Sequence, residues 1–323
     1  MAERAPAGLT AVEEERAAEP DSSSPAIHTV ELAKRYGRTV ALAGLTMTVP
    51  RGEIFGFLGP NGAGKTTAVK LLTGLIAPTS GEAMVLGVRA GDVAARAHMG
   101  YLPELFRYQD WLSGREVLAL HCELARLPRS VWGKAISEAL TEVGLSDRGD
   151  DRVATYSKGM QQRLGLGVAL LGRPELVFLD EPTSALDPVG RHDVREVIRQ
   201  LRGRGVTVFL NSHLLAEVEQ VCDRVAIVDR GRVIATGTMD ELLRGDAVKM
   251  RVTGLAPDQR AHLGSFGELF DEGEWLTLRG LKEDRIPELV AAAVGMGGRV
   301  HAVEPRHQNL EDRFLQLLSE EER

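Results

Sequence analysis

Residues 59–67 read Gly59-Pro60-Asn61-Gly62-Ala63-Gly64-Lys65-Thr66-Thr67. The stretch matches G-x-x-x-x-G-K-[ST], the pattern of a phosphate-binding loop. An apolar run at residues 54–58 precedes the loop and predicts a buried strand, and residues 67–72 follow it and predict a helix. This strand, loop and helix are the context that the pattern requires, so the sequence predicts a nucleotide-binding α/β protein.

Each residue type in this loop suits a phosphate for a physical reason. Gly59, Gly62 and Gly64 allow a tight turn and a close approach to a triphosphate, because they lack a Cβ. The loop N–H groups and the helix N-terminus then face the phosphates. Lys65 neutralises the β- and γ-phosphates, and the Thr66 hydroxyl ligates Mg²⁺. We therefore expect all of residues 59–67 to contribute to binding a nucleotide with Mg²⁺.

Composition limits the classes of protein to consider. The chain has 323 residues, which predicts one large or two modest domains. Its formal net charge of −7 argues against a nucleic-acid binder held by a basic surface. Cys122 and Cys222 lie far apart without metal-ligand spacing, which favours reduced thiols in a cytosolic protein. The most apolar stretch, residues 164–171, is far shorter than the roughly 18 residues of a membrane span.

The pattern along the chain predicts a tail and two structured parts. Residues 1–26 are rich in Ala, Glu, Pro and Ser and are expected to form a disordered tail. Strands and helices alternate over residues 27–245, which indicates a P-loop NTPase core with a parallel sheet. Residues 92–172 are mostly helical and are expected to form an inserted subdomain. The buried strands are expected at 54–58, 176–179, 206–210 and 225–228, and the helices at 111–127, 134–143, 161–171 and 191–202.

The pattern changes after Gly245. Residues 246–323 predict the order β-α-β-β-α-β followed by one more helix, which fits a small ferredoxin-like α+β unit. This segment contains no phosphate-binding loop and no clustered catalytic residue types. We expect it to be an accessory unit with a regulatory or dimer-stabilising role.

A second candidate element of the site is an apolar run that ends in two acids. Residues 176–179 are apolar, and Asp180 and Glu181 follow directly. Such a run is typical of a parallel strand buried on both faces, whose C-terminal end lies where α/β proteins bind ligands. Asp180 suits Mg²⁺, and Glu181 suits the general base that polarises the attacking water. Taken alone, the pair fits two solvated acids about equally well; beside a phosphate-binding loop, we favour the catalytic interpretation.

Three further segments, in order, resemble one family. They are Tyr156-Ser157-Lys158-Gly159-Met160-Gln161-Gln162-Arg163, then Ser184-Ala185-Leu186-Asp187, and a strand ending in Asn211-Ser212-His213. Together with the phosphate-binding loop, they resemble the ATP-binding subunits of ABC transporters over residues 27–245. Several independent motifs agree, so the resemblance is specific.

The resemblance implies roles for single residues. Ser157 and Gly159 match the signature loop, which binds the γ-phosphate of an ATP held by the other subunit. Tyr36 matches the aromatic residue that stacks on adenine, although a packed Tyr on a strand is the alternative. Asp187 matches the loop that contacts the opposite subunit, and His213 matches the switch histidine that reaches the γ-phosphate.

Two departures from the family pattern are visible. The usual Leu-Ser-Gly-Gly-Gln of the signature becomes Tyr-Ser-Lys-Gly-Met, and the cation at Lys158 still suits a phosphate. Similar variants resemble those of exporters that pair a separate ATPase chain with a separate permease. Glu104 stands where the family usually has a glutamine near Mg²⁺ and the permease contact, and an acid can also ligate Mg²⁺.

The resemblance therefore implies an ATPase subunit that binds ATP and Mg²⁺, pairs with a second ATP-binding subunit as a homodimer, and powers an integral-membrane permease, for export. Its place is the cytoplasm, at the inner membrane face through the permease. The alternative is a soluble ABC-type ATPase acting on nucleic acid or the ribosome, which the acidic balance and the single cassette disfavour. A small-molecule kinase or GTPase is a third class, which the signature and His213 disfavour. Residues 165–167 resemble half of a dinucleotide fingerprint, but close helix packing explains them better.

Overall fold

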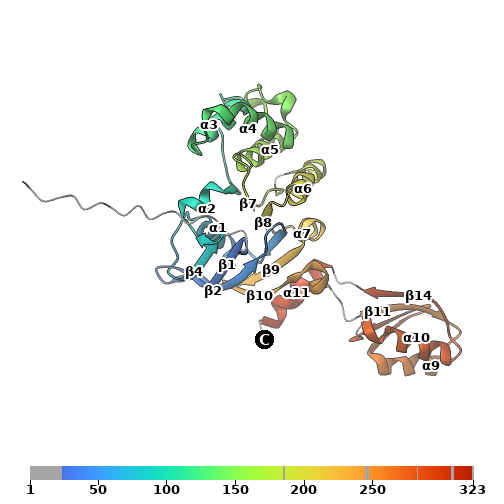
Figure 1. Cartoon of the computed structure of the whole chain (residues 1–323). Helices are drawn as coiled ribbons and strands as arrows, with labels where there is room; N and C mark the ends of the chain where they lie inside the picture. The colour runs from blue at the N-terminus through green and yellow to red at the C-terminus, as the bar shows by residue number, and fades with distance from the viewer. Residues whose placement is uncertain (1–23, 185, 244–246, 282, 307–308, 322–323) are drawn as a thin grey trace, which may run out of the picture.

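The computed structural model describes residues 24–184, 186–243, 247–281, 283–306 and 309–321 (Figure 1). Most of the expected tail, residues 1–23, therefore lies outside the described residues. Residues 24–26, which were expected to belong to the tail, are held by the core. Ala26 is fully buried, its carbonyl accepts from the N–H of Leu86, and the Ser24 carbonyl accepts from Nε of Arg51. Ala26 directly precedes the first strand, which begins at Ile27.

A six-stranded sheet forms the centre of the nucleotide-binding half. Its order is β10-β9-β3-β8-β7-β6, and all neighbours are parallel except the pair β10 and β9. The strands are β3 (Ile54–Leu58), β6 (Met99–Leu102), β7 (Leu176–Asp180), β8 (Thr207–Asn211), β9 (Arg224–Asp229) and β10 (Arg232–Thr238). Every residue of β3, β7 and β8 is buried, as expected for parallel strands covered on both faces. The four strands expected from apolar runs are confirmed.

A second, antiparallel sheet lies beside the first and was not predicted. Its order is β2-β1-β4-β5. The strands are β1 (Ile27–Tyr36), β2 (Thr39–Val49), β4 (Ser80–Val85) and β5 (Val88–Arg89). Its buried side chains share one cluster with α1 (Lys65–Leu72) and with Phe55, Phe57, Phe178 and Phe209 of the central sheet. The Phe209 ring lies between the other three, with ring centroids 5.2–5.8 Å away, so this cluster fixes the strands on either side of the phosphate-binding loop.

Seven more helices are described in this half. They are α2 (Val93–Ala97), α3 (Gly114–Leu124), α4 (Arg129–Glu142), α5 (Lys158–Ala169), α6 (Pro188–Gly203), α7 (Leu215–Val221) and α8 (Met239–Leu243). Ser113 and Glu116 form a capping box that starts α3 three residues later than the apolar pattern suggested. Asp187 accepts from the N–H of Gly190 and starts α6 at Pro188. The five helices expected in this half, including the one after the phosphate-binding loop, are confirmed, and side-chain caps set the starts of α3, α5 and α6.

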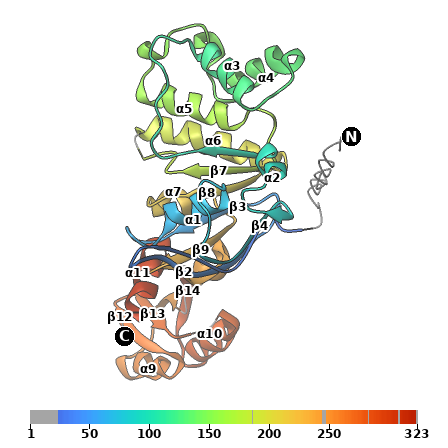
Figure 2. The ribbon, with the colours of Figure 1, turned by 90° about the vertical axis from the view of Figure 1, so that its left-hand side faces the viewer.

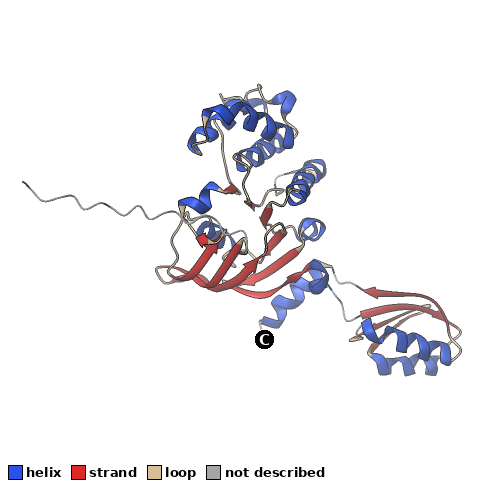
Figure 3. Cartoon of the chain, in the orientation of Figure 1, coloured by secondary structure: helices blue, strands red, loops and turns tan. Residues whose placement is uncertain are grey.

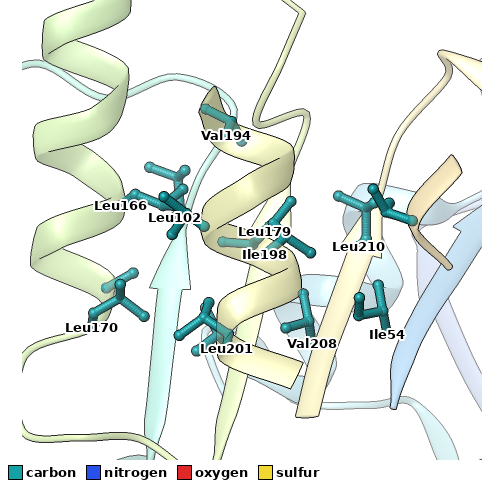
Figure 4. Packing of buried hydrophobic residues seen from close by; sticks show 14 of the residues in the cluster. Ile54, Leu102, Leu166, Leu170, Leu179, Val194, Ile198, Leu201, Val208 and Leu210 are labelled. Carbon is teal, nitrogen blue, oxygen red and sulfur yellow. The ribbon is translucent and has the colours of Figure 1, made fainter. Parts of the chain in front are cut away.

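The expected helical segment 92–172 also contains a strand of the central sheet. β6 pairs in parallel with β7, and Tyr101 lies opposite Phe178. The sequence Met99-Gly100-Tyr101-Leu102 is too short and too mixed to stand out as an apolar run. The helices α3, α4 and α5 follow β6, and they pack with α6 and the sheet through one continuous apolar cluster. Figure 4 shows Leu166 and Leu170 of α5 near Ile198 and Leu201 of α6.

Gly165 serves helix packing, as the sequence suggested, whereas a Cβ on Gly167 would make only ordinary contacts, the nearest at 3.5 Å from Cγ2 of Val143. A Cβ on Gly165 would lie 2.8 Å from Cδ1 of Leu102 and 2.9 Å from Cζ of Phe106. A larger residue at position 165 would therefore force the side chains of Leu102 and Phe106 to shift. The fragment therefore has no need of a dinucleotide to explain it.

Gly165→Ala is expected to destabilise the protein by about 1–3 kcal/mol, because the new methyl overpacks the contact with Leu102 and Phe106. Gly133→Ala in α4 is the matched control, since a Cβ there meets nothing within 4 Å and its exposed helical position is expected to gain about 0.5–1 kcal/mol. Urea unfolding of both variants measures the two changes. Equal stabilisation by both would contradict the packing role of Gly165.

The C-terminal region forms its own β-rich layer. Its elements are β11 (Ala247–Thr253), α9 (Pro257–His262), β12 (Glu268–Glu272), β13 (Trp275–Arg279), α10 (Ile286–Gly295), β14 (Arg299–Arg306) and α11 (Leu310–Glu321). The sheet order is β12-β13-β11-β14, and every pair is antiparallel. A separate apolar cluster joins this sheet to α10 and the turn after α9. The final helix, α11, leaves this layer and lies against the nucleotide-binding half (Figure 2).

Cys122 and Cys222 are free and buried, and burial raises the pKa of both thiols. Among the helices of the described residues, none is both long and apolar enough to cross a membrane.

Candidate active site

A cavity of about 460 Å³ lies at the C-terminal end of the parallel strands. This is the edge where open α/β sheets bind their ligands. Its lining comes from five separate parts of the chain. The lining residues are Gly59, Pro60, Asn61, Lys65, Thr66, Glu104, Glu181, Asn211, Ser212, His213, Leu215 and Phe314.

The three glycines of the phosphate-binding loop are required for different structural reasons. A Cβ on Gly59 would lie 2.3 Å from the Val228 carbonyl oxygen, and one on Gly64 would lie 2.4 Å from that of Ala41. These two glycines are therefore demanded by close packing of the loop against the protein backbone, in addition to any ligand. Gly62 has φ +85° and open space around it, so it leaves the approach to the loop free. Gly64 also has φ +99° and caps α1, whose N-terminus points to the cavity side of the loop.

Lys65 lies inside the curve of this loop. Its Nζ donates to the carbonyl oxygens of Gly59 at 2.6 Å and Pro60 at 3.2 Å. Burial lowers the pKa of the Lys65 ammonium, and the nearby carboxylates oppose this effect, in the order Glu181, Asp180 and Glu104. The side chain is thus a partly desolvated cation among acids, and an anionic phosphate is the ligand that it suits.

Asp180 ends β7 in a buried position beside the end of β8. Nδ2 of Asn211 donates to Oδ1 of Asp180, and the two residues are partners in the strand register. Burial raises the pKa of the Asp180 carboxyl, and the hydrogen bond from Asn211 partly offsets this rise. Oδ1 of Asn211 is a buried acceptor without a hydrogen-bond partner among the described residues. A buried acid beside an unused acceptor fits a cation or its bound water.

Glu181 is held in a strained backbone conformation. Its φ is +52°, and a non-glycine residue in the left-handed region costs roughly 1–2 kcal/mol. The strain is fixed from both sides, because its N–H donates to the Asn211 carbonyl at 2.8 Å and its own carbonyl accepts from the N–H of Ser184 at 3.4 Å. The turn aims the nearly buried carboxylate into the cavity. Strain of this kind collects at functional sites, where it presets a side chain.

His213 lies next to this carboxylate. Its Nδ1 lies 2.8 Å from Oε2 of Glu181, and Oγ of Ser212 lies 3.5 Å from the same oxygen. The His213 side chain is 54% exposed, so it can exchange this partner for a ligand in the cavity. The candidate base and the candidate switch residue are therefore in direct contact.

Glu104 lines the opposite side of the cavity, just after β6. Burial, followed by the charges of Asp180 and Glu104, raises the pKa of Tyr101 to about 12. Tyr101 therefore keeps its hydroxyl proton at neutral pH. Glu104 adds negative charge at the position where the family pattern has a neutral glutamine.

The remaining predicted site residues do not line the cavity. Tyr36 ends β1, is 49% exposed and has Nζ of Lys34 5.2 Å from its ring centroid. Ser157 caps α5, with its Oγ accepting from the N–H of Met160 at 3.2 Å. Ser157 and Lys158 are exposed, and Gly159 is half-buried. The structure thus joins the phosphate-binding loop to Glu104, Glu181 and His213, and it leaves the signature loop and Tyr36 outside this cavity.

Sequence reasoning missed several lining residues. Asn211 and Ser212 were noted only as neighbours of His213, although Asn211 bonds Asp180 and Ser212 contacts Glu181. Phe314 comes from the last helix, more than 100 residues beyond His213. Its spacing with Leu310 and Leu317 indicates an apolar helix face, but nothing in that spacing says which surface the face covers.

The residues present fit a nucleoside triphosphate with Mg²⁺. The described residues hold no cluster of three or more His, Cys, Asp or Glu that forms a metal site by itself. Proteins commonly hold Mg²⁺ through one or two carboxylates together with substrate phosphates. Thr66, Glu104 and Asp180 are the residues that would hold the ion, and the unused Oδ1 of Asn211 is a further oxygen nearby.

Comparison with known proteins identifies the family of the chain. The family model described as ABC transporter matches residues 42–184. An ABC transporter ATP-binding protein from Nostoc is 41% identical over 88% of this chain and 85% of its own length. A daunorubicin resistance ATP-binding protein from Streptomyces coeruleorubidus is 44% identical over 65% of this chain and 67% of its own.

A solved structure gives the same result for the fold. The ATP-binding subunit of an ABC transporter superposes with a TM-score of 0.61 at 32% identity, over 68% of this chain and 92% of that one. The match leaves about a third of this chain unpaired, and the chain carries a β-rich layer beyond the α/β core. With its phosphate-binding loop, its paired acids and these relatives, the chain belongs to the ATP-binding, ATP-hydrolysing proteins of the ABC transporter family.

Proposed function

We propose that this chain is the ATPase subunit of an exporter, working as a homodimer on a separate membrane permease at the inner face of the membrane. The observation that carries the proposal is the convergence of Lys65, Glu181 and His213 on one cavity at the end of the parallel strands. The daunorubicin resistance relative supports export, because its name assigns it to drug resistance. The net charge of −7 speaks against the nucleic-acid alternative.

Each residue of the proposed site has its own role in ATP binding or hydrolysis. Lys65 holds the β- and γ-phosphates with the loop N–H groups, and Thr66 and Asp180 hold Mg²⁺, which supplies charge neutralisation at the phosphates. Glu181 takes a proton from the attacking water, and its left-handed backbone presets its carboxylate for this task. His213 contacts Glu181 in this structure and moves to the γ-phosphate when ATP binds. Tyr36 stacks on the adenine from outside the cavity lining.

The second copy completes the site. Ser157, Lys158 and Gly159 form an exposed helix N-terminus, which suits the phosphate of an ATP bound by the other subunit. Asp187, which caps α6, lies on the contact between the copies. We propose that two chains pair head to tail and bind two ATP molecules between them.

We also propose how the chain divides into domains. Residues 27–245 are the ATP-binding domain, with the helices between β6 and β7 as its helical subdomain. The layer formed by β11 to β14 is a ferredoxin-like accessory unit, because its strand order and its antiparallel pairs match the split β-α-β arrangement. Its role is to regulate or stabilise the dimer.

We propose that the permease contacts this chain beside Glu104. Leu105 is 87% exposed and Trp111 is 71% exposed, and both flank the packed rings of Phe106 and Tyr108. Large exposed apolar side chains next to the site are typical of a protein interface. Movement of the permease would reach Glu104, and hence the cavity, through this short segment.

A tagged chain purified from its own membranes in mild detergent is expected to bring a polytopic membrane protein with it. The double variant Leu105→Asp, Trp111→Ala should weaken this association at least about tenfold, because loss of one interface hot spot costs about 2 kcal/mol or more. Val294→Asp on α10, also an exposed apolar position, is the control and should retain the partner. Retention of the partner by the double variant would refute the placement, and absence of any membrane partner from the parental chain would refute the transport function.

A further inference from the structure

The helix α11 belongs by contact to the nucleotide-binding half. Leu310 is fully buried and Leu317 nearly so, and both join the apolar cluster that contains residues of β3, β7 and β8. The helix contacts α7, α8 and β10, and Figures 1 and 2 both show it beside the central sheet. The chain thus leaves the core at β11, builds the accessory layer and returns to the core.

The start of α11 is bonded to the helix that follows the switch histidine. The N–H of Leu310 donates to Oε2 of Glu219 on α7 at 2.9 Å. Oδ1 of Asn309 accepts from the N–H of Asp312 at 2.7 Å and caps the helix. Leu310, Phe314 and Leu317 lie on one face of the helix, because they are spaced by four and three residues. A cap, a hydrogen bond across the contact and an apolar face together fix α11 against α7.

Phe314 extends from this face to the nucleotide cavity. It lines the cavity together with His213 and Leu215. Leu215 is the first residue of α7 and follows His213 by two positions. Both Phe314 and Leu215 are partly buried against the same apolar cluster. One wall of the ATP cavity is therefore an aromatic ring from the far end of the chain.

The segment 211–215 is anchored by hydrogen bonds at both ends: Asn211 bonds to Asp180 and Glu181, and the carbonyl of Leu214 accepts from the N–H groups of Glu217 and Val218. The N–H of Leu214 donates to Oγ of Ser212 at 3.1 Å, and Oγ of Ser212 reaches Glu181 only at 3.5 Å. His213 is half exposed and depends on the backbone on both sides for its place beside Glu181. An apolar ring against this segment limits its movement and also keeps water from that side of the cavity, which strengthens the charge interactions inside.

We propose that Phe314 is a positioning residue for hydrolysis: docked on α7, it holds the switch segment 211–215 so that His213 and Glu181 keep their productive geometry. The inference deepens the proposed function, since it rests on Glu181 and His213 acting on ATP. It also makes the return of α11 to the core a requirement for turnover. The accessory layer is then joined to the switch segment by a continuous chain and a packed helix.

Phe314→Ala in the full-length chain is expected to lower kcat for ATP about tenfold, within the roughly 10²-fold that a 1 Å misplacement of a reacting group can produce. The dissociation constant for ATP should change by less than about twofold, because the phosphate-binding loop is untouched. Phe314→Leu should restore most of the rate, since it returns an apolar side chain to the same contact. Leu315→Ala, one residue on and 59% exposed, is the matched control and should keep the parental kcat.

Hydrogen exchange provides the second readout. The amides of residues 211–221 should exchange faster in Phe314→Ala than in the parental chain, and those of α1 should not change. A parental kcat in Phe314→Ala overturns the proposal, and so does an equal loss in Leu315→Ala or a loss explained entirely by weaker ATP binding. If Phe314→Ala does not fold, Phe314→Gln makes the same comparison with a polar side chain that fills more of the space than alanine does. Failure of the Glu181 assignment is a separate result, because it is measured with Phe314 intact.

Discussion

Glu181→Gln is expected to remove most ATP turnover while ATP still binds. The substitution keeps the size of the side chain but removes the group that accepts a proton from water. Loss of a general base typically lowers the rate about 10²–10⁴-fold. The backbone turn should persist, because it is held by main-chain bonds to Asn211 and Ser184 rather than by the carboxylate. Binding should persist as well, since Lys65 and the loop N–H groups hold the phosphates.

Two measurements on the purified variant separate these effects. Steady-state phosphate release gives kcat, and equilibrium binding of ATP gives the dissociation constant. Glu82→Gln, a substitution of an exposed acid on β4, controls for loss of one negative charge and should leave both values unchanged. Hydrolysis by Glu181→Gln at the parental rate would show that another residue serves as the base.

The fold could be predicted wherever one local signal was strong. β3, β7, β8 and β9 are apolar runs buried on both faces, and such runs are visible in a single sequence. β1 and β2 were missed because they alternate irregularly and are interrupted by register shifts, so no clean period remains. β6 was missed because its pairing with β7 depends on residues more than 70 positions away. Pairing partners are tertiary information, which spacing does not contain.

The residues of the candidate site likewise include some that local sequence signals predict and others that depend on tertiary structure. The phosphate-binding loop and the two acids are contiguous motifs, and their residue types indicate phosphate binding, metal binding and proton transfer. The left-handed backbone at Glu181 and the bond from Asn211 to Asp180 arise only when two strands end side by side. Phe314 reaches the cavity from α11, which follows the separate C-terminal layer in the chain and packs on the nucleotide-binding half. No local sequence pattern predicts that packing.

The same cavity lacks one group that the family pattern supplies. Within one chain, Lys65 lines the cavity and Ser157 does not, although each is expected to contact the phosphates of an ATP. Ser157 instead caps an exposed helix N-terminus, where its hydroxyl and the first N–H groups can meet a phosphate from outside. The simplest way to satisfy both expectations is a site shared between two copies of the chain.

The shared site predicts different losses for two variants. Lys65→Ala should weaken ATP binding to its own chain about 10- to 100-fold or more, because a buried charge-assisted hydrogen bond contributes about 1.5–3 kcal/mol. Ser157→Ala should leave binding by the monomer nearly intact but stop hydrolysis, because the γ-phosphate of the opposite ATP loses its partner at the dimer contact. Equilibrium binding and phosphate release measure both. Arg152, a nearby exposed residue outside the signature, provides the control Arg152→Ala, which should retain hydrolysis.

Dilution tests the shared site without any substitution. If two copies complete each site, the rate per chain must fall as the protein is diluted through the concentration at which light scattering or sedimentation shows dimers separating. ATP binding per chain should stay constant over the same range, because the phosphate-binding loop is complete in one copy. The fall should also appear in the parental chain in the presence of saturating ATP, which removes loss of nucleotide as its cause. A rate per chain that stays flat where the protein is demonstrably monomeric, together with full activity of Ser157→Ala, would mean that one copy hydrolyses ATP alone, and the signature loop would then need another explanation.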